Sequence, residues 1–177
     1  MSIKKKSTLS AAVLALIAVG ASAPKISEQF LKEKEGYSTV AYKDGVGIPT
    51  ICDGLTTYQG ERVKMGMRLT DSQCSKESER QKQVGYKWID NNIKVKLSEP
   101  QRAAVFSFCY WNLGPTKCMG STFYQRINKG DFIGACEAIK WWIKDQGKDC
   151  KVRSNNCYGQ VIRRDQESEL ACWGLTK

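Results

Sequence analysis

Two kinds of hydrophobic spacing divide this chain into a small strand-rich part and a longer helical part. From residue 24 apolar positions recur at helical spacing, which predicts a short amphipathic helix that ends at Glu35 with Gly36 just beyond it. Residues 37–60 change to short alternating runs separated by turn residues such as Lys43-Asp44-Gly45. This pattern predicts a hairpin or a small meander.

The rest of the chain is helical in pattern. Thr70 with Gln73 forms one capping box, and Ser98 with Gln101 forms another, which opens an apolar helix that stops near Gly114. Apolar periodicity and capping residues predict three further helices, at 121–130, 131–142 and 159–173. The predicted fold class is therefore α+β, with a small N-terminal β-sheet lobe joined to a mainly helical C-terminal lobe.

The N-terminus has the layout of an export signal. Three lysines at positions 4–6 precede an uncharged stretch, residues 7–24, which carries the triplet Ala21-Ser22-Ala23 typical of a signal-peptidase site. The residue after the triplet is Pro24. A bond to proline is a tertiary amide without an N–H, so cleavage there is expected to fail.

An uncleaved segment predicts a membrane anchor over residues 1–24 and a catalytic domain over 25–177. Eighteen helical residues, 7–24, reach about 27 Å, against a hydrocarbon core of about 30 Å, and many of them are Ala, Ser, Gly or Thr. A helix this marginal is expected to insert with its basic end inside and later to leave. An ordinary cleaved signal peptide is the alternative.

Charge and cysteine content restrict the function classes. The formal net charge of +10 favours polyanionic partners, but no nucleic-acid-binding motif accompanies it, so no nucleic-acid partner is expected. The chain has no histidine and no C-x-x-C pair, so we expect neither a metal site nor a cofactor.

Eight cysteines without metal-ligand spacing indicate disulfides and an oxidising compartment such as the periplasm. Buried free thiols in a cytosolic protein are the alternative. Closeness in sequence predicts the pair Cys150–Cys157. The other six cysteines are assigned without such an argument, as Cys52–Cys74, Cys109–Cys118 and Cys136–Cys172.

The predicted sheet region carries a candidate catalytic group, Glu35, Asp44 and Thr50, with the spacing E-x8-D-x5-T. A helix end followed by a hairpin brings two carboxylates to opposite sides of a groove, as inverting glycosidases require. The negative end of the helix dipole favours a protonated Glu35 as general acid. Asp44 in a polar turn stays ionised as base or stabiliser, and Thr50 offers a hydroxyl to hold water.

Three ordered blocks carry a family resemblance that spans residue 25 to the C-terminus. They read EGYSTVAYKDGVGIPTICDG, then LSEPQRAAVFSFCYWNLG with STFYQRINKGDFIGACEAIKWW, and finally GQVIRRDQESELACWG. The first block resembles the active-site segment of the phage-type lysozymes, the endolysins of glycoside hydrolase family 24. The N-terminal segment further resembles that of the signal-arrest-release endolysins.

The resemblance implies a lysozyme-like fold and places the family's catalytic residues on Glu35, Asp44 and Thr50. It also implies hydrolysis of the β-1,4 bond between N-acetylmuramic acid and N-acetylglucosamine in peptidoglycan, leading to host cell lysis. The enzyme is then expected to be a monomer, held by residues 7–24 at the periplasmic face of the inner membrane and released to the periplasm on depolarisation. Some relatives exchange a cysteine of the anchor into a disulfide, but residues 1–25 contain none.

Other residues and functions remain open at this point. Trp111 and Asn112 are candidates for sugar binding, with a core tryptophan as the alternative. Trp141 and Trp142 are interpreted as packing residues. Arg163 and Arg164 are interpreted as exposed residues on a helix surface that pair with Glu167. A lytic transglycosylase on the same glycan, or a non-enzymatic cationic protein that disrupts membrane or wall, are the alternative functions.

Overall fold

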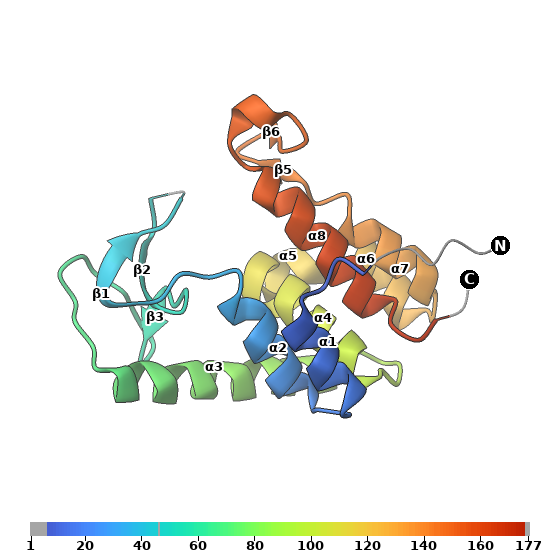
Figure 1. Cartoon of the computed structure of the whole chain (residues 1–177), viewed down its shortest axis with the longest axis horizontal. Helices are drawn as coiled ribbons and strands as arrows, with labels where there is room; N and C mark the ends of the chain where they lie inside the picture. The colour runs from blue at the N-terminus through green and yellow to red at the C-terminus, as the bar shows by residue number, and fades with distance from the viewer. Residues whose placement is uncertain (1–6, 46, 176–177) are drawn as a thin grey trace.

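The computed structural model describes residues 7–45 and 47–175 and has the α+β architecture that the sequence predicts. Figure 1 shows a small sheet lobe beside a larger bundle of helices, with one long helix running beneath both. Each lobe has its own cluster of buried apolar side chains. The molecule therefore consists of two lobes, each packed around its own core.

The sheet lobe consists of two short antiparallel pairs. Strand β1 (Ser38–Lys43) pairs with β2 (Pro49–Cys52), and β3 (Thr57–Tyr58) pairs with β4 (Glu61–Arg62). The β1–β2 register is regular at the loop end and shifts further along the strands, so the strands bend there. The interior of this lobe is a small apolar core, which consists of Ala41, Ile51, Cys52, Leu55, Val63 and Cys74.

Helix α3 (Asp71–Asn92) joins the two lobes. It begins with the predicted capping box, in which Thr70 and Gln73 bond to each other's backbone N–H groups. In Figure 1 it runs under the sheet lobe and continues beneath the helical lobe. A side chain on Gly85 of this helix would overlap the rings of Phe106 and Tyr110, so the glycine allows α3 to approach the central helix closely.

A nearly continuous buried helix is the centre of the helical lobe. It starts as α4 (Glu99–Val105) and widens into a π-helical segment, η1 (Phe106–Leu113). The side chains of residues 103–109 are fully buried, which explains why this stretch of the helix is almost entirely apolar. Other helices surround it: α2 (Ala23–Lys32), α5 (Pro115–Met119), α6 (Thr122–Asn128), α7 (Phe132–Ile139) and α8 (Tyr158–Ala171).

All eight cysteines are paired in disulfides. Cys52–Cys74 joins β2 to α3, and Cys109–Cys118 joins η1 to α5. Cys136–Cys172 joins α7 to the end of α8. Cys150–Cys157 closes the loop that contains the 3₁₀ turn η2 (Arg153–Asn155). These are the four pairs named from the sequence.

The segment expected to act as an anchor is folded onto the helical lobe in this structure. It forms α1 (Ala11–Ala18), turns at Gly20 with φ +68°, and enters α2 at Ala23. Leu9 and Val13 are buried in the main core. No helix among residues 7–45 and 47–175 has the length and apolar character needed to cross a membrane. The three lysines at positions 4–6 lie outside the described residues.

Two predicted helix boundaries are wrong. Helix α2 ends at Lys32 rather than Glu35, because the N–H groups of Lys34 and Glu35 both bond to the carbonyl of Leu31 in a closing turn. Gly36, the expected left-handed residue, does not have a positive φ.

Helix α7 ends at Ile139, not at residue 142. The chain then forms an unpredicted hairpin of β5 (Lys144–Asp145) and β6 (Lys148–Asp149). The two tryptophans before it continue the apolar pattern but not the helix. Trp141 is 57% exposed beside the Arg126 guanidinium and is not a core residue, whereas Trp142 packs edge-on against Phe108.

Candidate active site

A cleft with a cavity volume of about 930 Å³ lies between the two lobes. Its lining comes from the turn after α2, the β1–β2 loop, the segment after β2, the end of η1, α5, the β5–β6 hairpin and the start of α8. Four of the residues singled out in the sequence line it together: Glu35, Asp44, Trp111 and Asn112. The cleft therefore collects polar and aromatic groups that are far apart in the chain.

Glu35 is bound by the helical lobe and lies close to the sheet lobe. Its Oε1 atom lies 2.8 Å from Nη1 of Arg163 on α8, and its side chain is 23% exposed. On the other side it approaches the backbone of Gly54, where φ is +99° and an added Cβ would lie 3.3 Å from Oε2. Glycine at this position thus lets the sheet lobe come close to the carboxylate without crowding it.

Asp44 is the first residue after β1 and belongs to the loop that leads to β2. Its Oδ1 atom accepts a hydrogen bond of 2.8 Å from the backbone N–H of Ile48, and its own N–H donates to the carbonyl of the same residue. The loop is thereby closed on itself. The aspartate is fixed by local backbone geometry and presents its side chain to the cleft.

Thr50 lies behind this loop rather than in the cleft. It is 3% exposed, and its hydroxyl donates to the carbonyl of Ile48 at 3.0 Å. In the β1–β2 register it stands opposite Tyr42. The residues that line the cavity do not include Thr50, so the structure brings together the two carboxylates and leaves the threonine in the adjoining strand.

The surroundings of the cleft perturb two tyrosines. Burial raises the pKa of Tyr42, and the nearby negative charges of Glu35 and Asp44 raise it further. Burial also raises the pKa of Tyr110, which lines the cleft from η1. Both carboxylates of the cleft therefore act on the same tyrosine.

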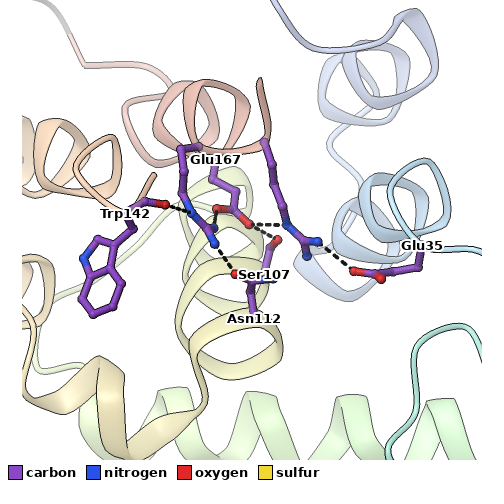
Figure 2. Close-up of polar contacts among 7 residues, drawn as sticks. Glu35, Ser107, Asn112, Trp142 and Glu167 are labelled. Carbon is purple, nitrogen blue, oxygen red and sulfur yellow. Dashed lines mark hydrogen bonds and ion pairs between the residues drawn. The ribbon is translucent and has the colours of Figure 1, made fainter. Parts of the chain in front are cut away.

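Behind Glu35 lies a buried network of charged groups that the sequence did not reveal. Figure 2 shows the Glu167 carboxylate between two guanidinium groups, with Glu35 contacting one of them. Arg163 contacts both glutamates, at 2.8 Å and 3.2 Å, and Arg164 contacts the other oxygen of Glu167. The hydroxyl of Ser107 donates to Glu167 at 2.6 Å.

The interpretation of Arg163-Arg164 as a helix surface is therefore wrong, although the pairing with Glu167 is confirmed. Arg164 and Glu167 are fully buried, and Arg163 is nearly so. Burial by itself lowers the pKa of Arg163, but the charges of Glu167 and then Glu35 outweigh it and raise the pKa. Only the i, i+4 spacing to Glu167 was visible in the sequence; the contact with Glu35 spans 128 residues.

Trp111 and Asn112 lie where the π-helical segment reaches the cleft. Trp111 is partly buried and Asn112 exposed, and the Oδ1 atom of Asn112 accepts a hydrogen bond from Arg164. Trp142 lines the same cavity and was missed as a site residue, because its pattern resembled packing. The indole groups offer flat apolar surface, and the amide offers hydrogen bonds, which suits a sugar ligand.

The chain matches the model of a known protein family. The family model described as phage lysozyme matches residues 32–167, a range that contains both carboxylates and the charged network. The chain belongs to the phage lysozyme family. It is accordingly a glycoside hydrolase of the muramidase class.

Three known proteins similar to this phage lysozyme cover most or all of its length. The SAR-endolysin of Escherichia phage 933W is 59% identical over 177 residues, 100% of both chains. A protein named "Probable prophage lysozyme" of Escherichia coli (strain K12) is 58% identical over 175 residues, 99% of both chains. Among solved structures, the endolysin from Escherichia coli O157:H7 phage FAHEc1 has a TM-score of 0.69 and 31% identity, covering 85% of this chain and 93% of its own.

Proposed function

We propose that this endolysin cleaves the β-1,4 bond between N-acetylmuramic acid and N-acetylglucosamine with Glu35 as general acid and Asp44 as base. The observation that carries these roles is the position of the two carboxylates in one cleft, each held differently. Glu35 is fixed by its ion pair with Arg163 on α8, and Asp44 by its own loop. The proposed site uses residues of one chain only, so we expect the enzyme to act as a monomer.

In this reaction the carboxyl proton of Glu35 passes to the glycosidic oxygen as the bond from that oxygen to the anomeric carbon breaks. Asp44 takes a proton from a water molecule, whose oxygen adds to the anomeric carbon. Arg163 orients the Glu35 side chain before substrate arrives.

Thr50 has a supporting role in this proposal. Its hydroxyl donates to the carbonyl of Ile48, next to the Asp44 loop, and its oxygen can still accept a hydrogen bond from water. Trp111 and Asn112 bind the sugar rings from the helical side of the cleft.

The bond chemistry is tested by the ends of the products. Purified peptidoglycan digested with the enzyme is expected to give muramic acid ends that borohydride reduces, because hydrolysis adds water across the bond. A lytic transglycosylase would leave 1,6-anhydro ends that resist reduction. Mass spectrometry of the reduced fragments distinguishes the two, and a majority of anhydro ends would overturn the assignment of Asp44 as the base that activates water.

We further propose that residues 7–24 first hold the enzyme at the periplasmic face of the inner membrane and that the described fold is the released form. In this fold the segment is held by carboxylates of the helical lobe. Glu169 accepts hydrogen bonds from Ser7 and from the N–H of Thr8, and Glu33 accepts one from Ser10. These polar contacts and the burial of Val13 stabilise the folded position once the segment has left the bilayer.

Release is expected to depend on the membrane potential. Moving the three lysines at positions 4–6 from the negative to the positive side of the membrane costs about 7 kcal/mol at 100 mV, and this cost disappears on depolarisation. Adding an ionophore to expressing cells is therefore expected to move full-length protein from the membrane to the soluble fraction. The Glu35→Gln background lets fractionation be measured without lysis.

Two variants at the turn control this experiment. Gly20→Leu with Ser22→Leu makes the segment more apolar and is expected to keep the protein in the membrane fraction after ionophore. Gly20→Ser places a side chain on the same left-handed residue without adding apolar surface, and is expected to be released like the parent. A soluble protein that begins at Pro24 or Lys25 would show instead that the segment is a cleaved signal peptide.

A further inference from the structure

Arg164 joins the buried charged network to residues on the helical side of the cleft. Its Nη1 atom contacts Glu167, and its Nη2 atom donates a hydrogen bond to Oδ1 of Asn112. Its Nε atom donates to the backbone carbonyl of Trp142 at 3.1 Å, and Figure 2 shows these contacts made by one guanidinium group. Each nitrogen of the guanidinium thus has a partner, and the residue is fully buried. Arg164 therefore acts on a ligand through the residues that it holds.

The π-helical segment η1 brings two side chains to this network. Ser107 donates to Glu167, and Asn112 accepts from Arg164. These two residues are five positions apart, which is the hydrogen-bond step of a π-helix, so both side chains can lie toward α8. In an α-helix, residues five positions apart point roughly 140° away from each other. The wider helix therefore lets one face of η1 contact both ends of the Arg164–Glu167 pair.

The contact with a guanidinium group fixes the direction of the Asn112 amide. Arginine has only donors, so the amide turns its oxygen toward Arg164 and its NH₂ group away from the network. Asn112 is exposed and lines the cleft. Within residues 7–45 and 47–175, no hydrogen bond from this NH₂ group to another residue is present. The amide therefore offers a donor to a ligand in the cleft.

We infer that Arg164 is a positioning residue for glycan recognition, because it directs the NH₂ group of Asn112 toward an acceptor oxygen of the sugar. This role rests on the proposed function, in which Asn112 binds the sugar rings. Suitable acceptors are hydroxyl groups and the carbonyl oxygens of acetamido groups. Glu167 lies between the two arginines, so one buried carboxylate supports both Arg163 beside the general acid and Arg164 beside the sugar-binding amide.

A double-mutant cycle tests whether Arg164 acts through Asn112. The substrate is soluble, uncross-linked peptidoglycan strands, assayed over a range of concentrations. Arg164→Lys keeps a positive charge beside Glu167 but lacks the planar fork that reaches the amide. It is expected to raise the apparent KM roughly 2- to 12-fold, the range for a side chain that must be ordered on binding, with kcat nearly unchanged. In the Asn112→Ala background the same substitution is expected to raise KM no further.

Arg102→Lys is the matched control, because its guanidinium pairs with Asp90 and does not line the cleft. It is expected to have the parental KM. Losses that multiply in the double variant, or a parental KM for folded Arg164→Lys, would overturn the positioning role. A parental KM for Asn112→Ala in an active enzyme would also overturn it. A parent enzyme that leaves the strands intact would contradict the proposed hydrolysis instead, so the two failures are distinguishable.

Two substitutions of Asn112 test the amide orientation without changing the buried arginine. Asn112→Asp keeps an oxygen acceptor for Arg164 and removes the NH₂ donor, whereas Asn112→Ala removes both groups. Both are expected to raise KM by a similar factor, but only Asn112→Ala is expected to lower the unfolding temperature measured by circular dichroism. A parental KM for Asn112→Asp would mean that glycan binds the amide oxygen and would overturn the orientation. This comparison decides the question even if Arg164→Lys fails to fold.

Discussion

Replacing Glu35 with glutamine is expected to reduce hydrolysis of purified peptidoglycan by roughly 100- to 10,000-fold or more, the range for loss of a general acid. Glutamine has the same shape and can still bond to Arg163, but it has no acidic proton for the glycosidic oxygen. The fold should survive, because the side chain lies at the surface of the cleft and is not part of either core. Zymograms and turbidity assays on purified wall measure the loss, and circular dichroism checks the fold.

Glu33→Gln provides the matched control. It removes the same charge two residues away, from a carboxylate that contacts Ser10 and Gln29 and does not line the cleft. It is expected to retain nearly full activity on purified wall. If the folded Glu35 variant kept substantial activity and the Glu33 variant lost it, the general acid would be Glu33. Killing of cells by a Glu35 variant without wall hydrolysis would support the non-enzymatic alternative.

Replacing Glu167 with glutamine is expected to lower the free energy of unfolding by about 3–5 kcal/mol, the usual cost of removing one partner from a buried ion pair. Glu167 is fully buried and pairs with both Arg163 and Arg164, so its neutralisation leaves two guanidinium groups without their shared counter-ion. Urea denaturation with the disulfides intact measures the change. Wall hydrolysis should also fall, because Arg163 no longer has the partner that fixes it beside Glu35.

Glu137→Gln shows what an exposed ion pair contributes. Glu137 pairs with Lys140 on the surface of the helical lobe at the same i, i+3 spacing that joins Arg164 to Glu167. Its loss is expected to change the free energy of unfolding by less than about 0.5 kcal/mol. Equal, small effects of the two substitutions would mean that the network is hydrated and that burial does not strengthen it.

Signals carried by neighbouring residues were enough to predict much of the fold. The capping boxes at Thr70 and Ser98 start α3 and α4 where expected, because a cap depends on residues only three positions apart. The alternation in residues 37–60 predicts the paired strands of the sheet lobe for the same reason. Helix ends were less predictable, as in α7, where apolar residues continue after the helix has stopped.

The candidate site was likewise only partly predictable from the sequence. Glu35 and Asp44 are nine residues apart, so a helix end and a hairpin bring them to one cleft, and their roles could be proposed from the sequence. The hairpin with Lys144 was not predicted, because the two tryptophans before it extend the helical pattern. Its place beside the cleft follows from how the chain returns to α8.

Ordered motifs and short spacings in the sequence were enough to indicate the family, the fold class and a candidate pair of catalytic carboxylates. The contact of Arg163 with Glu35, 128 residues away, and the joint burial of Arg164 and Glu167 became visible only in the folded structure. The same holds for the contact between the start of the N-terminal segment and Glu169 on α8. Such contacts depend on how helices pack after they form, and no local pattern of residues specifies which distant groups will meet.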